Sequence, residues 1–246
     1  MTDRISLDVH AHLAPVDPAA LAKIAGVSWD AAAGTMTVDG HTIGIKPLFR
    51  PEALLAWMDE HGVEHAWISV PPPLYRPELR GDAARVWANY VNDGLSKIAA
   101  AHSQRFSPLP HLPLQEPALA AEIVRSFIAR GHNRFAAPSG GNDDQVLSDP
   151  AFAPLWQALD AARAFVFFHP GECADGRLDA FYLSNLVGNP YESAVALSHL
   201  VFGGVLEAYP AIRFCFAHGG GALPMLAGRL EQGFATARPG IKTGGR

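Results

Sequence analysis

The chain has 246 residues with a net charge of −5 at pH 7, and 49% of its residues are hydrophobic. This length is typical of one large globular domain, and the slight excess of acidic residues excludes the basic surface expected of a nucleic-acid-binding protein. Its longest apolar region, residues 194–206, is interrupted by polar residues and glycines, and its two cysteines are too few for a disulfide framework, so we expect a cytoplasmic protein without a membrane span.

Short apolar segments alternate with helical patterns along the chain, which is typical of βα units around a parallel sheet. The predicted strands are residues 5–10, 65–70, 106–111, 134–137, 165–169 and 212–217. The predicted helices are residues 51–61, 82–102, 117–130, 149–163, 191–209 and 222–235. A closed barrel of this class needs about eight such units. We therefore expect a single α/β domain over residues 1–246, a (β/α)8 TIM-barrel-like fold that lacks its last one or two βα units.

A long connection, residues 13–50, follows the first predicted strand and is rich in glycine and proline. Within it, residues 36–43 resemble a small hairpin with Asp39-Gly40 as its turn. Loops that follow barrel strands usually build the active site. We therefore expect this loop and hairpin insertion to lie near the functional residues.

Four histidines fall at the ends of predicted strands: His10 and His12 at the end of the first, His169 at the end of the fifth and His218 directly after the sixth. Side chains alternate between the two faces of a strand, so His10 and His12 project the same way and can reach one ion. Neutral imidazole is a good ligand for Zn²⁺, and a catalytic zinc often keeps three protein ligands. Any one of these histidines taken alone would be read as a half-buried side chain, but the four together favour a metal site.

The motifs around these histidines resemble those of the amidohydrolase superfamily. The matching segments are His10-x-His12, Phe168-His169-Pro170 and Ala217-His218-Gly219-Gly220-Gly221. The most similar branch is the group of 2-amino-3-carboxymuconate-6-semialdehyde decarboxylases. The resemblance implies a metal-dependent hydrolase fold with one divalent metal ion, most often Zn²⁺, and non-oxidative decarboxylation of a small unsaturated or aromatic carboxylic acid.

Roles for individual residues follow from the same resemblance. It implies that His10, His12 and His169 are metal ligands and that His218 is the general acid/base next to the metal. Asp8 has the same strand parity as the first two histidines, and it either hydrogen-bonds one of their rings or caps the backbone. A second metal is not expected, because the fourth strand lacks the lysine that bridges two metals in other superfamily members.

The resemblance also implies how the substrate is bound. Arg229 matches a family arginine that reaches into the neighbouring subunit's site and binds the substrate carboxylate, which implies a homodimer; exposure on a helix is the alternative for this residue. A second family arginine has no secure equivalent, and Lys46 or Arg50 would take its place. The expected partners are thus a small carboxylate substrate and a second copy of the chain, with no nucleic acid and no membrane.

The sequence departs from the family pattern at its C-terminal end. The family's last metal ligand is an aspartate on the eighth strand, and no aspartate follows His218. We therefore expect a C-terminally truncated or divergent member. Three functions stay open: a metal-dependent decarboxylase, a metal-dependent hydrolase of an amide, ester or lactone, and a catalytically impaired barrel fragment with a scaffold role.

Overall fold

The structure is a computed structural model that describes residues 4–140, 146–173, 175–236, 238 and 240–241. The chain divides into two compact units, unit 1 over Met1–His111 and unit 2 over Leu112–Arg246. Each unit contains a parallel sheet and helices that connect its strands, so the α/β class predicted from the sequence is confirmed.

Unit 1 contains a three-stranded parallel sheet in the order β1-β5-β6. Its strands are β1 (Asp8–His12), β5 (Ala66–Ser69) and β6 (Phe106–Pro108). Its helical elements are α1 (Pro18–Leu21), η1 (Lys46–Phe49), α2 (Pro51–His61), η2 (Pro72–Leu74) and α3 (Gly81–Ala101). Helix α2 begins with Pro51 in its first turn and ends at Gly62, which has φ 70°. These are the start and stop signals that the sequence offers, and the helix has its predicted bounds.

The insertion in unit 1 forms a separate antiparallel sheet in the order β2-β3-β4. Its strands are β2 (Val27–Asp30), β3 (Thr35–Val38) and β4 (His41–Ile43). The predicted hairpin is confirmed, and both residues of its turn, Asp39 and Gly40, have positive φ, as a two-residue turn of type I′ requires. The buried guanidinium of Arg76 donates two hydrogen bonds of 2.8 Å to the Asp39 carboxylate and thereby holds the hairpin against the loop after β5.

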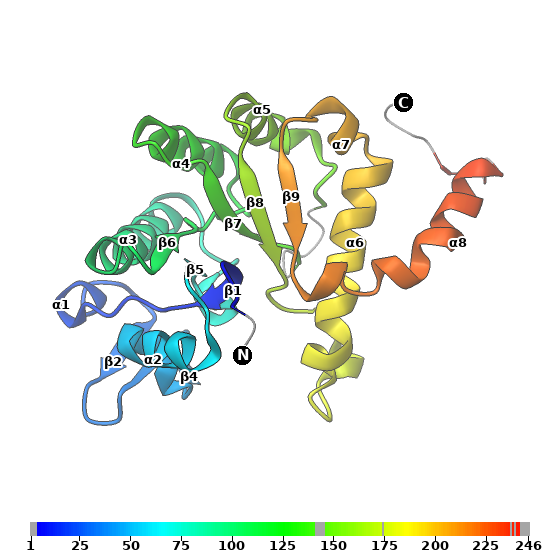
Figure 1. Cartoon of the computed structure of the whole chain (residues 1–246). Helices are drawn as coiled ribbons and strands as arrows, with labels where there is room; N and C mark the ends of the chain where they lie inside the picture. Colours follow the sequence, from blue (N-terminus) through cyan, green and yellow to red (C-terminus); the bar gives the residue numbers. More distant parts are fainter. Residues whose placement is uncertain (1–3, 141–145, 174, 237, 239, 242–246) are drawn as a thin grey trace. The chain divides into compact units, whose positions relative to one another are not determined.

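Unit 2 contains the second parallel sheet, in the order β7-β8-β9, whose strands lie side by side in Figure 1. The strands are β7 (Arg134–Pro138), β8 (Phe165–His169) and β9 (Arg213–Phe216). Its longer helices are α4 (Pro117–Ala129), α5 (Ala153–Ala161), α6 (Asn189–Phe202) and α8 (Leu223–Ala235). Its shorter helical elements are η3 (Pro150–Phe152), η4 (Gly176–Leu178), η5 (Ser184–Gly188), α7 (Val205–Ala208) and η6 (His218–Gly220). The rings of Phe168 and Phe216 stack at 4.9 Å across β8 and β9 and fill part of the core.

Several predicted boundaries differ from those in the structure. Strand β1 is displaced toward the C-terminus, so both His10 and His12 lie within it. Strand β6 ends at Pro108 and not at residue 111, because Pro110 has no N–H to donate and the N–H of His111 is bound by the Asn92 side chain. The helix predicted over 191–209 is two helices, α6 and α7, since Gly204 adopts φ 70° between them.

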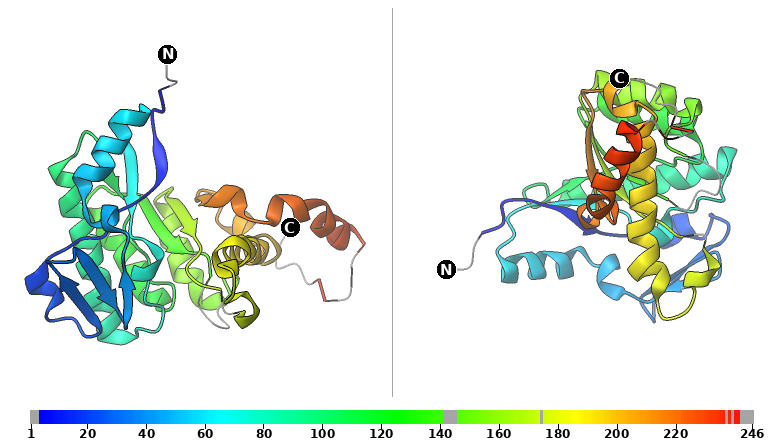
Figure 2. Two further views of the ribbon diagram at one scale, coloured as in Figure 1. Left: turned by 90° about the horizontal axis from the view of Figure 1, so that it is seen from below. Right: turned by 90° about the vertical axis from the view of Figure 1, so that its right-hand side faces the viewer.

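Helix α8 projects away from the β7-β8-β9 sheet in the views of Figures 1 and 2. None of its described side chains is buried, and Met225 is 88% exposed. Large exposed apolar side chains are common one at a time, but α8 carries several on one short helix. Among the described residues, no helix has both the length and the apolar character needed to cross a membrane.

Candidate metal centre

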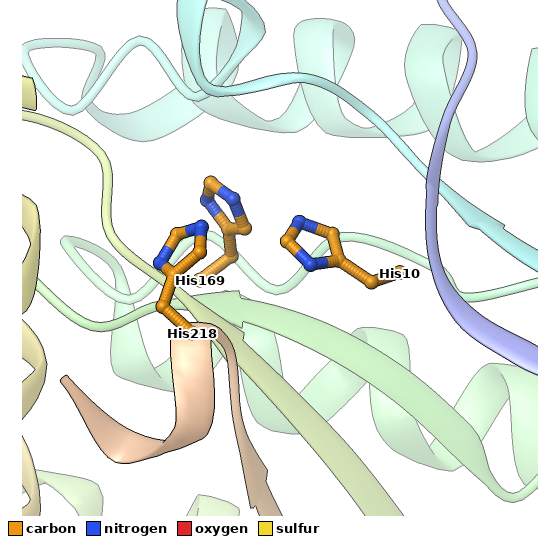
Figure 3. A group of neighbouring side chains, drawn as sticks. All are labelled: His10, His169 and His218. Carbon is orange, nitrogen blue, oxygen red and sulfur yellow. The ribbon is translucent and has the colours of Figure 1, made fainter.

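Two of the predicted site residues meet in unit 2 at the carboxyl ends of adjacent parallel strands. His169 is the last residue of β8, and His218 follows β9 at the start of η6. Their ring centroids are 5.0 Å apart, and Figure 3 shows the two rings next to each other. His169 is buried and His218 is exposed, so one imidazole is fixed by its surroundings while the other is open to a ligand from solution.

The hydrogen bond of the His169 ring fixes its tautomer. Nδ1 lies 2.8 Å from the carbonyl oxygen of Pro170, and a carbonyl oxygen only accepts hydrogen bonds. Nδ1 therefore carries the proton, and Nε2 keeps its lone pair. A histidine held in this way by a backbone carbonyl has the form found in protein metal ligands.

The turn that carries His218 has an unusual backbone. His218 has φ 54°, and the three glycines after it, Gly219, Gly220 and Gly221, also have positive φ. A side chain on Gly221 would place its Cβ 2.3 Å from the carbonyl oxygen of Pro190. The glycines thus allow the turn to pass close to α6, and His218 itself sits in a conformation that costs about 1 kcal/mol or more for a residue with a side chain.

In unit 1, His10 and His12 lie close together on β1, as their spacing predicts. Their ring centroids are 5.1 Å apart with an edge-to-face arrangement. Oδ1 of Asp8 accepts a hydrogen bond of 2.8 Å from the backbone N–H of His10, so the structure shows the capping role that the sequence left open for Asp8. Nδ1 of His12 lies 3.0 Å from Oγ of Ser69 on the adjacent strand β5.

The three expected substrate-binding cations lie on the surfaces of their own units. Lys46 is the first residue of η1, Arg50 precedes α2, and Arg229 lies on α8. All three are exposed. Their roles therefore stay predictions.

A buried histidine that the sequence analysis did not place in the site is His111, three residues after β6. Its ring stacks on Tyr75 at 5.0 Å, and neither ring nitrogen has a hydrogen-bond partner within the described part of the chain. Burial lowers the pKa of His111 to about 4, so the ring is neutral at pH 7. Asn92 binds both the N–H and the carbonyl of this residue, which holds its backbone in place. The position after a strand was visible in the sequence, but its burial was not.

A further polar contact, between Cys173 and Glu192, lies in unit 2. The Cys173 thiol donates a hydrogen bond to the Glu192 carboxylate, and burial raises the pKa of both groups. A raised thiol pKa keeps Cys173 protonated, so this cysteine is not an activated nucleophile.

The chain belongs to the amidohydrolase family, whose sequence model matches residues 7–239. This confirms the resemblance on which the site prediction rests. A similar protein is 2-amino-3-carboxymuconate-6-semialdehyde decarboxylase of Dictyostelium discoideum, which is 29% identical over 248 residues that cover 96% of this chain and 68% of that protein. The protein of the same name from Caenorhabditis elegans is 26% identical over 80% of this chain and 61% of its own length.

A solved structure shares the fold. It is 5-carboxyvanillate decarboxylase from Novosphingobium aromaticivorans, complexed with manganese and 4-hydroxy-3-methoxy-5-nitrobenzoic acid. The TM-score is 0.78 at 20% identity, over 98% of this chain and 74% of the other. The relatives are thus decarboxylases by name, and the chain spans about two thirds of the length of the curated ones.

Proposed function

We propose that the chain is a metal-dependent, non-oxidative decarboxylase of a small aromatic or unsaturated carboxylic acid, with a (β/α)8-type barrel as its architecture. The observation that carries the proposal is the pair of strand-end histidines in unit 2, one of them held as the Nδ1–H tautomer. The family and the names of the relatives support the same reaction.

The donor set fits one divalent ion. We propose that His10, His12 and His169 are its ligands and that His218 lies next to it. Imidazole nitrogens bind Zn²⁺ and several other divalent ions. Because the similar 5-carboxyvanillate decarboxylase is complexed with manganese, Mn²⁺ is the alternative to Zn²⁺ in this proposal.

A divalent ion in such a site acts as a Lewis acid that withdraws negative charge from oxygen atoms of the substrate. In the proposed reaction His218 acts as the general acid and gives a ring proton to the carbon that bears the carboxylate. The bond between that carbon and the carboxylate then breaks, its electron pair returns to the unsaturated system, and CO₂ leaves. The exposed ring of His218 is open to a substrate and can regain its proton from solvent.

The anionic substrate needs cations near the metal. We propose Arg229 for this role, acting in the site of a second copy of the chain, with Lys46 or Arg50 as a further contact. All three are exposed and so are available to a ligand or a partner. A cytoplasmic homodimer is part of this proposal.

The test compares metal content and product formation in matched variants. Metal per chain is measured by elemental analysis for the purified chain, for His169→Ala and for His199→Ala. His199 is a partly buried, hydrogen-bonded histidine of the same unit that lies on α6, away from the strand ends, so it serves as the control. CO₂ release is then assayed with 2,6-dihydroxybenzoate and 5-carboxyvanillate, the substrates named by similar decarboxylases.

We expect about one divalent ion per chain in the wild type and in His199→Ala, loss of the ion in His169→Ala, and CO₂ release only when the ion is present. Formation of a new acid or alcohol without CO₂ would favour a hydrolase. Absence of both metal and turnover in the wild type would refute the proposal and favour a scaffold role.

A further inference from the structure

Ser69 contacts one of the proposed metal ligands from the neighbouring strand. It is the last residue of β5, and the parallel pairing of β1 and β5 places it opposite His12. Its Oγ lies 3.0 Å from Nδ1 of His12 and 3.4 Å from the carbonyl oxygen of Ala11. Ser69 is 1% exposed, so water competes little for these hydrogen bonds.

The proton of the Ser69 hydroxyl has two possible acceptors. If it is donated to Nδ1 of His12, the ring must carry its own proton on Nε2. If it is donated to the carbonyl of Ala11, then Nδ1 of His12 carries the proton and donates it to Oγ. Only the second arrangement leaves Nε2 of His12 with a lone pair for a metal, because Nδ1 faces Ser69.

We propose that Ser69 is a positioning residue that holds His12 as the Nδ1–H tautomer and orients Nε2 toward the metal. The inference rests on the proposed function, since it matters only if His12 binds a metal. In this proposal the Ser69 hydroxyl accepts the Nδ1 proton of His12 in unit 1, as the Pro170 carbonyl accepts the Nδ1 proton of His169 in unit 2. The Ser69 hydroxyl can accept the His12 proton as that carbonyl does, because its own proton can be donated to the carbonyl of Ala11 on β1.

The chain offers a matched control in the same sheet. Ser107, on β6, accepts or donates an equivalent hydrogen bond of 2.9 Å with Nε2 of His65, a histidine outside the proposed site. We therefore compare Ser69→Ala, the hydroxyl-retaining variant Ser69→Thr, and Ser107→Ala. Each alanine variant deletes one oxygen from a Ser–His pair, and only one of the two pairs includes a proposed ligand.

Two measurements decide the question. Long-range ¹H–¹⁵N spectra of the metal-free protein show which nitrogen of His12 carries the proton, and His12→Gln assigns the signals. Titration with Zn²⁺ or Mn²⁺ alone gives the affinity. We expect the Nδ1–H form of His12 in the wild type, a mixture of tautomers in Ser69→Ala, and metal binding weaker by about 10-fold or more, with recovery in Ser69→Thr and no change in Ser107→Ala.

The Nε2–H form of His12 in the wild type, or equal metal affinity of Ser69→Ala and wild type, would overturn the role of Ser69 and leave the proposed function standing. Failure of the wild type to bind either ion would refute the proposed function instead. In that case the spectra of the metal-free protein still decide whether Ser69 sets the tautomer.

Discussion

Replacement of Gly221 by alanine tests whether the turn after β9 has the close approach that the structure gives it. The new Cβ would lie 2.3 Å from the carbonyl oxygen of Pro190 and 2.9 Å from its Cα, and these are backbone atoms that cannot rotate away. Gly221 also has φ 65° and ψ −130°, a region that is almost restricted to glycine.

The cost has three parts. The backbone conformation costs a residue with a Cβ about 1–3 kcal/mol. Relief of the overlap with Pro190 costs about 1–3 kcal/mol more. Alanine also lowers the conformational entropy of the unfolded chain relative to glycine, which stabilises the folded state by about 0.4–1 kcal/mol. We therefore expect Gly221→Ala to lower the free energy of unfolding by about 3 kcal/mol.

Urea unfolding of the purified variants measures this change. The control is Gly228→Ala on α8, where a Cβ would meet no heavy atom within 4 Å. In that helix alanine should leave stability unchanged or raise it by up to about 1 kcal/mol. Equal urea midpoints for Gly221→Ala and wild type would show that the turn does not press against α6, and would remove the reason given for its glycines.

Three further predictions concern charge, pH and metal. Asp39→Asn should lower the free energy of unfolding by about 2 kcal/mol in urea titrations, because the Arg76 side chain is 5% exposed and would lose its main carboxylate. Asp30→Asn, at the end of β2, is the control and should cost less, because the Asp30 carboxylate accepts hydrogen bonds from the backbone N–H groups of Ala32 and Ala33. Burial lowers the pKa of His111 to about 4, so between about pH 6.5 and pH 4 this residue binds a proton in the unfolded chain but not in the folded chain. The free energy of unfolding should therefore fall by about 3 kcal/mol as the pH is lowered across that window. His111→Phe should remove this part of the pH dependence. A chelator should lower the urea midpoint of the wild type but not of His169→Ala, because an ion bound only by the folded state stabilises it; equal shifts in both would count against His169 as a ligand.

The positions of the parallel strands along the chain and most of the helix bounds could be predicted from the sequence, because apolar segments, proline at helix starts and glycine at helix ends act locally. Helix α2 has its predicted bounds for this reason. The prediction of one helix over residues 191–209 was wrong at Gly204, which has a left-handed conformation. A glycine inside a helical pattern can either continue the helix or end it, so the sequence did not decide between the two.

The candidate site shows the same division. His169 and His218 were predicted together because parallel strands end at the same edge of a sheet, and the structure confirms that their rings are neighbours. Ser69 and His111 could not be found in this way. The role of Ser69 depends on the register between β1 and β5, and that of His111 on burial beneath Tyr75, and neither depends on local sequence.

Oxidation of Met225 can report whether another molecule covers the exposed helix α8 in solution. Met225 is 88% exposed, whereas Met36 and Met58 are fully buried. Mild peroxide oxidation followed by mass spectrometry should therefore convert Met225 to its sulfoxide long before the other two. A concentration-dependent slowing at Met225 alone would locate an intermolecular contact on the helix that carries Arg229, without any label or mutation.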